Sequence, residues 1–507
     1  MSVDPRTPVL VGVGQFTERI DDPDYRGMSA VDLATAAVRE ALADTGAKGV
    51  ARAVDTVFAL RQFEISGPMP ATLGKSNNYP RSVMNRLGGD PARVVLEPVG
   101  GQGPQKLVTE ASNAIAAGDA DVVLIMGSEP GSTARYFANR DDKPNFTEHI
   151  EGQLEDRGHQ IFSYIDDYTI QHGLTGAPVQ YGLMENARRA RLGHSVADYR
   201  REMAELFAPM SKVAAKNPFS SSPLERSVDE IITVTDDNRM ICDPYPRLLV
   251  ARDQVNQGAA AVLMSVQAAT RLGVAQDKWV YLHGHSDMIE QAMLDRVDLG
   301  ASPAAVHAAR EALRVAGIGI DDIATFDLYS CFPFPVFVIC EALGIDADDP
   351  RGLTLTGGLP YFGGPGNSYS LHGIAETVAQ MRDRPGEFGL VGANGGIMSK
   401  YSVGIYSTTP VNWRTDNCAA LKKQIEALPK VAVTKEPDGA ATIETYSVRY
   451  DWPICTGIIV GRLAADDTRF MATTDDEDLV ALMSNDDPLG AQISVWSTDN
   501  GNRASLG

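Results

Sequence analysis

Apolar residues recur at three- and four-residue spacing in several stretches of the chain, and a short apolar run follows each stretch. The segments 39–46 (REALADTG) and 310–317 (REALRVAG) are nearly alike and continue Ala-rich helical patterns. Apolar runs follow them at 54–60 (VDTVFAL) and 323–330 (IATFDLYS). Helical periodicity before a short apolar run predicts a helix followed by a buried strand.

The same pair of elements recurs further along each half. A helical stretch at 109–120 precedes the apolar run 122–127, and another at 373–384 precedes 388–393. Alternating strands and helices are typical of parallel sheets covered by helices. We therefore predict an α/β core of two similar halves, although Ala-rich helices can also resemble one another by chance.

Two further regions depart from this pattern, and the first is an insertion. Residues 131–250 are polar, rich in arginine and aromatic residues, and contain a helical stretch at 196–217. A region this long is typical of an inserted subdomain, and we expect it over the strand ends, where open α/β sheets bind ligands. The two halves of the core are then residues 1–130 with 251–272, and residues 273–412.

The last region, residues 413–507, begins with a helical stretch at 419–430. The acidic stretch 475–487 is interpreted as a solvated helix rather than a metal site. Alternating segments separated by turn residues predict a small β-barrel, similar to an oligonucleotide-binding barrel. Its expected strands are 431–436, 441–451, 455–463 and 469–474.

Charge restricts the partners of this chain. Its 45 Lys and Arg against 66 Asp and Glu give a formal net charge of −21. Such a chain is not expected to bind nucleic acid or acidic membranes in general, although a local basic pocket can still hold a small anion. Acidic residues also outnumber basic ones in the barrel region, which argues against a nucleic-acid role there.

Cysteine usage favours a reducing compartment. The count is odd, the spacing is sparse, and no CxxC pair occurs, so neither a disulfide framework nor a zinc site is expected. The N-terminus lacks a signal-peptide pattern, and no run reaches the roughly 18 apolar residues of a membrane span. We therefore expect a cytoplasmic protein. The cysteines are Cys242, Cys331, Cys340, Cys418 and Cys455.

Several segments resemble the thiolase superfamily. The resemblance covers roughly residues 6–410 and, with the tail, is most similar to type-1 thiolase-like proteins, which carry an additional C-terminal domain. It implies a duplicated thiolase fold, a stacked αβαβα core with an inserted loop domain, and coenzyme A or acyl-CoA as ligand without a metal. The segments are 8–15 (PVLVGVGQ), 181–193 (YGLMENARRARLG), 238–265, 329–333 (YSCFP) and 357–376.

The catalytic positions that this resemblance implies depart from the family pattern. The nucleophilic cysteine normally stands three residues before a conserved glycine, and counting back from Gly103 that position is Gly100. The family's Gly-His-Pro histidine falls on Gly364, and the cysteine of its Cys-x-Gly sequence falls on Ala393. Little or no ordinary thiolase activity is therefore expected. The glycine turn at 100 either offers N–H groups to a thioester carbonyl or only packs a strand tightly against a helix.

Four residues remain as candidate groups. Tyr329 stands at the family's acid/base position, where similar retro-aldol lyases of sterol side chains use tyrosine; alternatively, it packs as an aromatic residue. His372 is either a base near the pocket or a hydrogen-bonded core histidine. Asn394 either donates to an oxyanion or only forms its turn. Cys331 is expected to be an inert small hydrophobe.

Coenzyme A carries phosphates, which require cations. Arg239, Arg247 and Arg252 lie in the segment similar to the family's CoA-contacting loop domain, and we assign them to that ligand, although each alone is typical of a surface arginine. Three functions remain open. They are a thiolase-like acyl-CoA-binding protein of the acetyl-CoA acetyltransferase family, a retro-aldol carbon–carbon lyase acting on a β-hydroxyacyl-CoA through Tyr329, and a non-catalytic acyl-CoA carrier or sensor.

The oligomeric state depends on one strand. In thiolases the strand leading to the nucleophile pairs with its twin across the dimer axis. Here we expect that strand to contain Pro98, which cannot donate a ladder hydrogen bond. The sequence is therefore consistent with a monomer, and a dimer stays open as the alternative, since most members of the family are dimers or tetramers.

Overall fold

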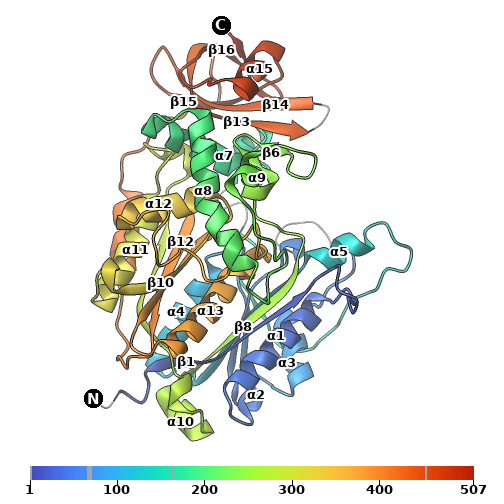
Figure 1. The fold of residues 1–507 in the computed structure, drawn as a ribbon, viewed down its shortest axis with the longest axis vertical. Coiled ribbons are helices and arrows are strands. Elements are labelled where there is room, and N and C mark those ends of the chain that lie inside the picture. The colour runs from blue at the N-terminus through green and yellow to red at the C-terminus, as the bar shows by residue number, and fades with distance from the viewer. Residues whose placement is uncertain (1–2, 66–70, 161–164, 452–453) are drawn as a thin grey trace.

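The computed structural model describes residues 3–65, 71–160, 165–451 and 454–507. Its core consists of two stacked sheets with helices between them and on both outer faces (Figure 1). The first sheet has the order β1 (Pro8–Glu18), β8 (Asn256–Ser265), β4 (Val122–Pro130), β2 (Thr56–Ala59), β3 (Arg93–Leu96) and β5 (Glu155–Asp156). The second has the order β10 (Ile323–Leu328), β11 (Phe388–Gly395), β12 (Lys400–Ser407) and β9 (Tyr281–Ile289).

Helices form three layers around these sheets. The central layer is α4 (Gly103–Ala117) and α13 (Tyr369–Asp383), whose buried side chains form one core with residues of both sheets. On the outer face of the first sheet lie α1 (Ala30–Asp44), α2 (Val50–Ala53), α3 (Tyr79–Leu87) and α10 (Val266–Leu272). On the outer face of the second lie α11 (Pro303–Ala316) and α12 (Pro333–Leu343). The duplicated α/β core expected from the repeats is thus confirmed.

The two halves use the same local signals. α4 carries Pro104 in its first turn, where the missing N–H is not needed, and it ends at Gly118, whose φ is 90°. α11 likewise carries Pro303 at its start and ends at Gly317, whose φ is 73°. α4 and α11 therefore begin and end in the same way, because the same residue types stand at their ends.

The first helix of the inserted region lies at the side of the core, and its later helices lie between the core and the C-terminal barrel (Figure 1). It contains α5 (Gly131–Phe137), α6 (Asp167–Gln171), α7 (Ala177–Leu192), α8 (Val196–Ala214) and α9 (Val228–Ile232). Its short strands β6 (Met240–Cys242) and β7 (Tyr245–Pro246) extend the sheet of the C-terminal barrel, because Cys242 pairs with Arg449.

The C-terminal region begins with α14 (Cys418–Glu426) and forms a small β-barrel, as expected. Its strands follow the order β14, β15, β17, β16 and β13, and pairing of β14 with β13 closes the barrel. The bounds are β13 (Gly439–Asp451), β14 (Ile454–Leu463), β15 (Arg469–Thr474), β16 (Gln492–Thr498) and β17 (Gly501–Leu506), with α15 (Glu477–Asn485) as the acidic helix.

Two expectations about strands were wrong. Residues 431–436 form no strand and contribute only one bridge, from Val433 to Arg469. The strand before the glycine turn ends at Leu96, so Pro98 lies beyond it. Instead, β5 pairs in parallel with β3, joining Leu96 to Asp156, and covers that edge from within the chain. Among the described residues, no helix is both long and apolar enough to cross a bilayer.

Candidate functional site

A cavity of about 650 Å³ lies where the two halves of the core meet the inserted region. Its walls come from the ends of β3, β10 and β11, and from the inserted segment 175–181. Most of these side chains are apolar or aromatic, as in small-molecule sites generally. The polar residues that line it are Glu64, Thr175, Gln180, Tyr181, Asp253, Tyr329, Cys331, Asn367 and Asn394.

The glycine turn between β3 and α4 forms one wall. Gly100 has φ 152°, and its N–H donates to Asn367 Oδ1 at 2.9 Å. Added at Gly100, a β-carbon would lie 2.9 Å from the side-chain carboxamide carbon of Gln102, so the turn is fitted to glycine. The Gly100 N–H therefore already has an acceptor in the protein and is not free for a ligand.

Tyr329 follows β10 and places its hydroxyl against this turn. A methyl group at Gly101 would lie 2.6 Å from Tyr329 Cζ and closer still to the hydroxyl. The side chain is 7% exposed and lines the cavity, and its hydroxyl has no hydrogen-bond partner among the described residues. Burial, and then the neighbouring Cys331, raise the pKa of Tyr329 well above its usual value. The hydroxyl is thus a neutral donor facing the cavity.

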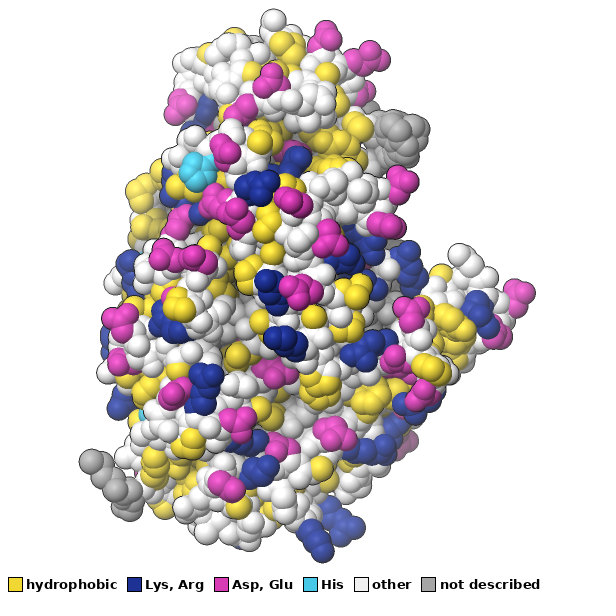
Figure 2. All heavy atoms as spheres, in the orientation of Figure 1, with side chains coloured by type: hydrophobic (Ala, Val, Ile, Leu, Met, Phe, Trp, Pro, Cys, Tyr) yellow, Lys and Arg dark blue, Asp and Glu magenta, His cyan; other side chains and the backbone are white. Residues whose placement is uncertain are grey.

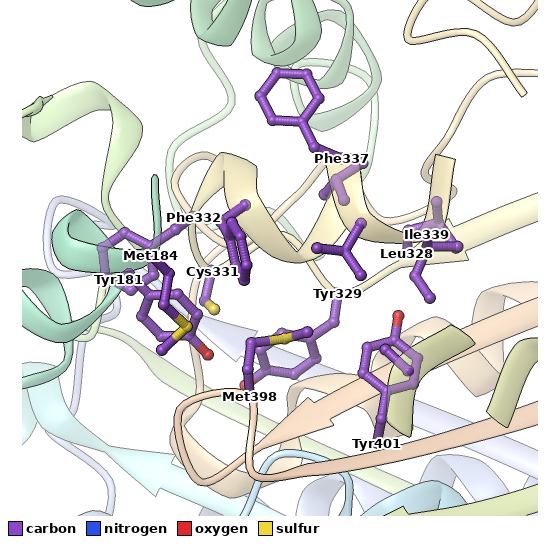
Figure 3. Close-up of a cluster of buried hydrophobic side chains, with 14 of the residues drawn as sticks. Tyr181, Met184, Leu328, Tyr329, Cys331, Phe332, Phe337, Ile339, Met398 and Tyr401 are labelled. Atoms are coloured by element: carbon purple, nitrogen blue, oxygen red, sulfur yellow. The ribbon is translucent and has the colours of Figure 1, made fainter. Parts of the chain in front are cut away.

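Asn394 organises a small polar group beside Tyr329. Its Nδ2 donates to the Tyr181 hydroxyl at 2.7 Å and to Cys331 Sγ at 3.7 Å, while its Oδ1 accepts from Met398 N at 3.2 Å. Figure 3 shows the Cys331 sulfur between the rings of Tyr181 and Tyr329. Both protons of the Asn394 amide are therefore directed at protein groups.

Cys331 lines the cavity, a position that its neighbours in the sequence did not predict. Burial raises the pKa of its thiol to about 12. The thiol therefore stays protonated at neutral pH, and since the thiolate is the nucleophilic form, it is a poor nucleophile. This agrees with its interpretation as an unreactive residue, although it contacts the cavity rather than only the core.

His372 is not brought together with Tyr329 and Asn394. It is fully buried in α13, its Nδ1 lies 2.7 Å from Gln15 Oε1, and its ring packs on Phe362 at 5.2 Å. Burial lowers the pKa of His372 to about 3, so the imidazole is neutral. This arrangement matches the core-histidine alternative.

Gly364 and Ala393 stand at the other two positions where the family's catalytic residues are replaced, and only Gly364 lines the cavity. Its neighbour Pro365 leads into the turn before α13. Ala393 is fully buried within β11, where it pairs with Ser402 of β12.

The three candidate arginines lie on the inserted region and the segment after it. Arg239 and Arg247 are exposed, and Arg247 Nη1 donates to the Asp237 carbonyl at 2.9 Å. Arg252 is half-buried between cavity residues 251 and 253, and its buried Nε has no acceptor among the described residues. Burial, then the positive charges of Arg247 and Arg135, lower the pKa of Arg252.

Arg135 is grouped with these three arginines because its charge acts on Arg252, as do the charges of Asp21 and Asp253. None of the described acidic side chains forms an ion pair with Arg135, Arg239, Arg247 or Arg252. Figure 2 shows Lys and Arg side chains gathered on the side of the molecule below the C-terminal barrel. Arg247 and Arg135 lie close enough to Arg252 for their charges to lower its pKa, and guanidinium groups placed in this way are suited to an anionic ligand.

Tyr181 is the site residue that sequence reasoning missed. It lies on α7 of the inserted region, lines the cavity, and stacks on Phe332 with ring centroids 4.4 Å apart. Its only signal was its place at the start of the segment 181–193, which marks a family resemblance but not a role. His283 and His285 of β9 contact the backbone carbonyls of Thr409 and Arg414, and the described part of the chain contains no cluster of three potential metal ligands.

Comparison with known proteins identifies relatives. Residues 420–500 match the model of the thiolase-like protein type 1 additional C-terminal domain. The chain is 60% identical to a monomeric SCP2-thiolase like protein type 1 from Mycobacterium smegmatis, whose crystal structure it matches over 100% of both chains with a TM-score of 0.87.

More distant relatives share parts of the chain. A Methanothermobacter thermautotrophicus acetyl-CoA acetyltransferase is 27% identical over 249 residues, which span 46% of this chain and only 61% of that enzyme. The Ltp2-ChsH2(DUF35) aldolase is 20% identical and shares the fold, with a TM-score of 0.59 over 81% of this chain and 100% of that one.

Proposed function

The chain belongs to the type 1 thiolase-like proteins with an additional C-terminal domain, and from this premise we propose that its cavity binds an acyl-CoA. The acyl thioester would lie in the apolar cavity beside Tyr329, and the phosphates of coenzyme A would lie on the arginine group. The observation that carries the proposal is Arg252, a half-buried arginine beside the cavity whose buried Nε has no acceptor among the described residues.

The same geometry supports little or no ordinary thiolase activity. Claisen chemistry needs a thiolate nucleophile and a second acid/base beside the α-carbon. Gly100, Gly364 and Ala393 supply neither group, and the cavity thiol of Cys331 has a pKa of about 12. The Tyr329 hydroxyl can still donate a hydrogen bond to the thioester carbonyl, which orients the ligand without attacking it.

A retro-aldol lyase is the second candidate, supported by the same unpartnered hydroxyl. In that reaction a base removes the proton of the β-hydroxyl, and the Cα–Cβ bond breaks to give a carbonyl compound and an acyl-CoA enolate. The raised pKa keeps Tyr329 protonated at neutral pH, so almost none of it is in the phenolate form that a general base requires; a general base works best with a pKa near the working pH. The hydroxyl therefore fits the donor role better than the base role.

Calorimetry tests ligand binding directly. We expect coenzyme A and acetyl-CoA to bind, and Arg252→Met to weaken both by about tenfold or more, because a charge-assisted hydrogen bond is worth about 1.5–3 kcal/mol. Arg310→Met is the matched control, since Arg310 is an exposed arginine of α11 and has no ion pair among the described residues. Absence of heat with either ligand would refute the proposal.

Turnover assays separate the remaining functions. Thiolysis of acetoacetyl-CoA faster than about 1 per second, an ordinary enzyme rate, would contradict the loss of thiolase chemistry. Cleavage of a β-hydroxyacyl-CoA that disappears in Tyr329→Phe would favour the lyase. Binding without turnover across a panel of β-hydroxyacyl-CoAs would favour a carrier or sensor.

A further inference from the structure

The segment 165–178 of the inserted region forms one wall of the cavity, and the C-terminal barrel holds it from behind. Ile165 and residues 175–178 line the cavity, whereas none of the described barrel residues does so. Between these lining residues lies α6, whose Tyr168 and His172 point into the barrel and are 7% and 1% exposed.

Tyr168 anchors the start of α6 in the barrel. Its hydroxyl accepts from the backbone N–H of Met471 at 2.9 Å and from Asn502 Nδ2 at 3.2 Å. Met471 belongs to β15 and Asn502 to β17, so one hydroxyl joins two barrel strands to the inserted region.

His172 anchors the end of α6. Its Nδ1 donates to the Tyr168 carbonyl at 2.7 Å, and its Nε2 accepts from the Asn502 backbone N–H at 2.8 Å. Gly501 packs against the same imidazole, because a methyl group there would lie 3.1 Å from Nε2. Both ring nitrogens are thus used, one within α6 and one across the interface.

The barrel also holds the helix that follows the wall. Thr445 of β13 donates to the Leu183 carbonyl at 2.6 Å, and Asn186 Nδ2 donates to the Tyr446 carbonyl at 3.0 Å. These contacts come directly after Tyr181, which lines the cavity. In Figure 1, α7 lies beneath the barrel, between it and the core.

We propose that the C-terminal barrel is a positioning element, which fixes the cavity wall 165–178 through Tyr168, His172 and Asn502. These residues act without touching the ligand, so Tyr168 is a positioning residue. A wall held in place by long-range hydrogen bonds determines how much room the cavity offers to an acyl chain. The effect on the acyl chain rests on the proposed acyl-CoA binding, whereas the positioning of the wall does not.

Hydrogen–deuterium exchange of the full chain tests the positioning without a ligand. Tyr168→Phe removes only the hydroxyl, and we expect the amides of residues 171–178 to exchange at least tenfold faster. Tyr406→Phe is the control, because that tyrosine is also buried and its hydroxyl bonds Gln105 in the central layer, away from the barrel. Should Tyr168→Phe fail to fold, Asn502→Ala keeps the backbone bond to His172 and should give a smaller rise in the same peptides.

Calorimetry with acyl-CoAs of increasing chain length completes the test. We expect Tyr168→Phe to change the affinity for long acyl chains and to leave the affinity for coenzyme A itself within twofold. Unchanged exchange in 171–178 overturns the positioning role, whatever binds. Faster exchange in a protein that binds no acyl-CoA keeps the positioning role and overturns the proposed function instead.

Discussion

Gly101→Ala tests the geometry on which the site depends. The added methyl group would lie 2.6 Å from both Tyr329 Cζ and the Asn394 carbonyl oxygen, and closer still to the Tyr329 hydroxyl. The carbonyl belongs to the backbone of β11 and cannot move cheaply, so the tyrosine must shift. Overpacking of this kind typically costs about 1–3 kcal/mol, and we expect a decrease of this size in the free energy of unfolding.

Gly176→Ala is the matched control for this variant. Gly176 lines the same cavity, has an ordinary φ of −137°, and would place its new methyl group 3.7 Å from the nearest side chain, Pro178. Its free energy of unfolding should remain within about 0.5 kcal/mol of the original chain, because the substitution meets no close neighbour.

Urea unfolding of four chains measures the coupling between Gly101 and Tyr329. The set is the original chain, Gly101→Ala, Tyr329→Phe and the double variant. Phenylalanine removes the hydroxyl but leaves Cζ, so the double variant should recover part of the loss, with a coupling energy of about 0.5–3 kcal/mol. Equal unfolding midpoints for Gly101→Ala and Gly176→Ala would show that Tyr329 does not lie against the turn.

Three further predictions concern stability and assembly. Glu185 accepts from the Tyr245 hydroxyl at 2.7 Å and from Phe334 N at 2.9 Å, and burial raises its pKa to about 7. Because Glu185→Ala leaves these donors without an acceptor, it should lower the free energy of unfolding, measured in urea, by about 3 kcal/mol or more. Glu185→Gln should lower it clearly less. Because burial lowers the pKa of His372 from 6.5 to about 3, the unfolded chain binds this proton more readily below pH 6.5. The free energy of unfolding should thus fall by up to about 1.4 kcal/mol per pH unit from pH 6.5 toward 3, and His372→Asn should remove that contribution; an unchanged slope would contradict it. Light scattering should find one species of 54.4 kDa, because β5 already covers the β3 edge; a mass twice as large would argue otherwise.

Several elements were predictable from the sequence because their signals are local. Ala-rich periodicity between a proline and a glycine sets the start and end of α4 and α11, whatever packs on them. The acidic stretch 475–487 forms α15 because its apolar residues still follow helical spacing. The repeated order of helix and strand was enough to indicate the stacked core, since that order restricts how sheets and helices can pack.

Strand partners were less predictable. β16 and β17 were missed, and residues 431–436 were wrongly expected to form a strand. Strand propensity reflects packing against neighbours more than the backbone itself, so a short alternating segment becomes a strand only where a partner edge is available. The same reason hid β5, a two-residue strand that pairs with β3 and whose Glu155 binds Arg93 of that strand.

The candidate site was likewise predictable from the sequence only in part. Sequence alone placed Tyr329, Asn394 and the glycine turn at strand ends, where a cavity was expected, because each directly follows an apolar run or forms part of a turn. Only the tertiary structure buried His372 against Gln15, 357 positions away, and brought Tyr181 from the inserted region onto Phe332. Periodicity reports which face of its own element a residue occupies; which other element meets that face is decided by how whole layers pack, and no local pattern carries that information.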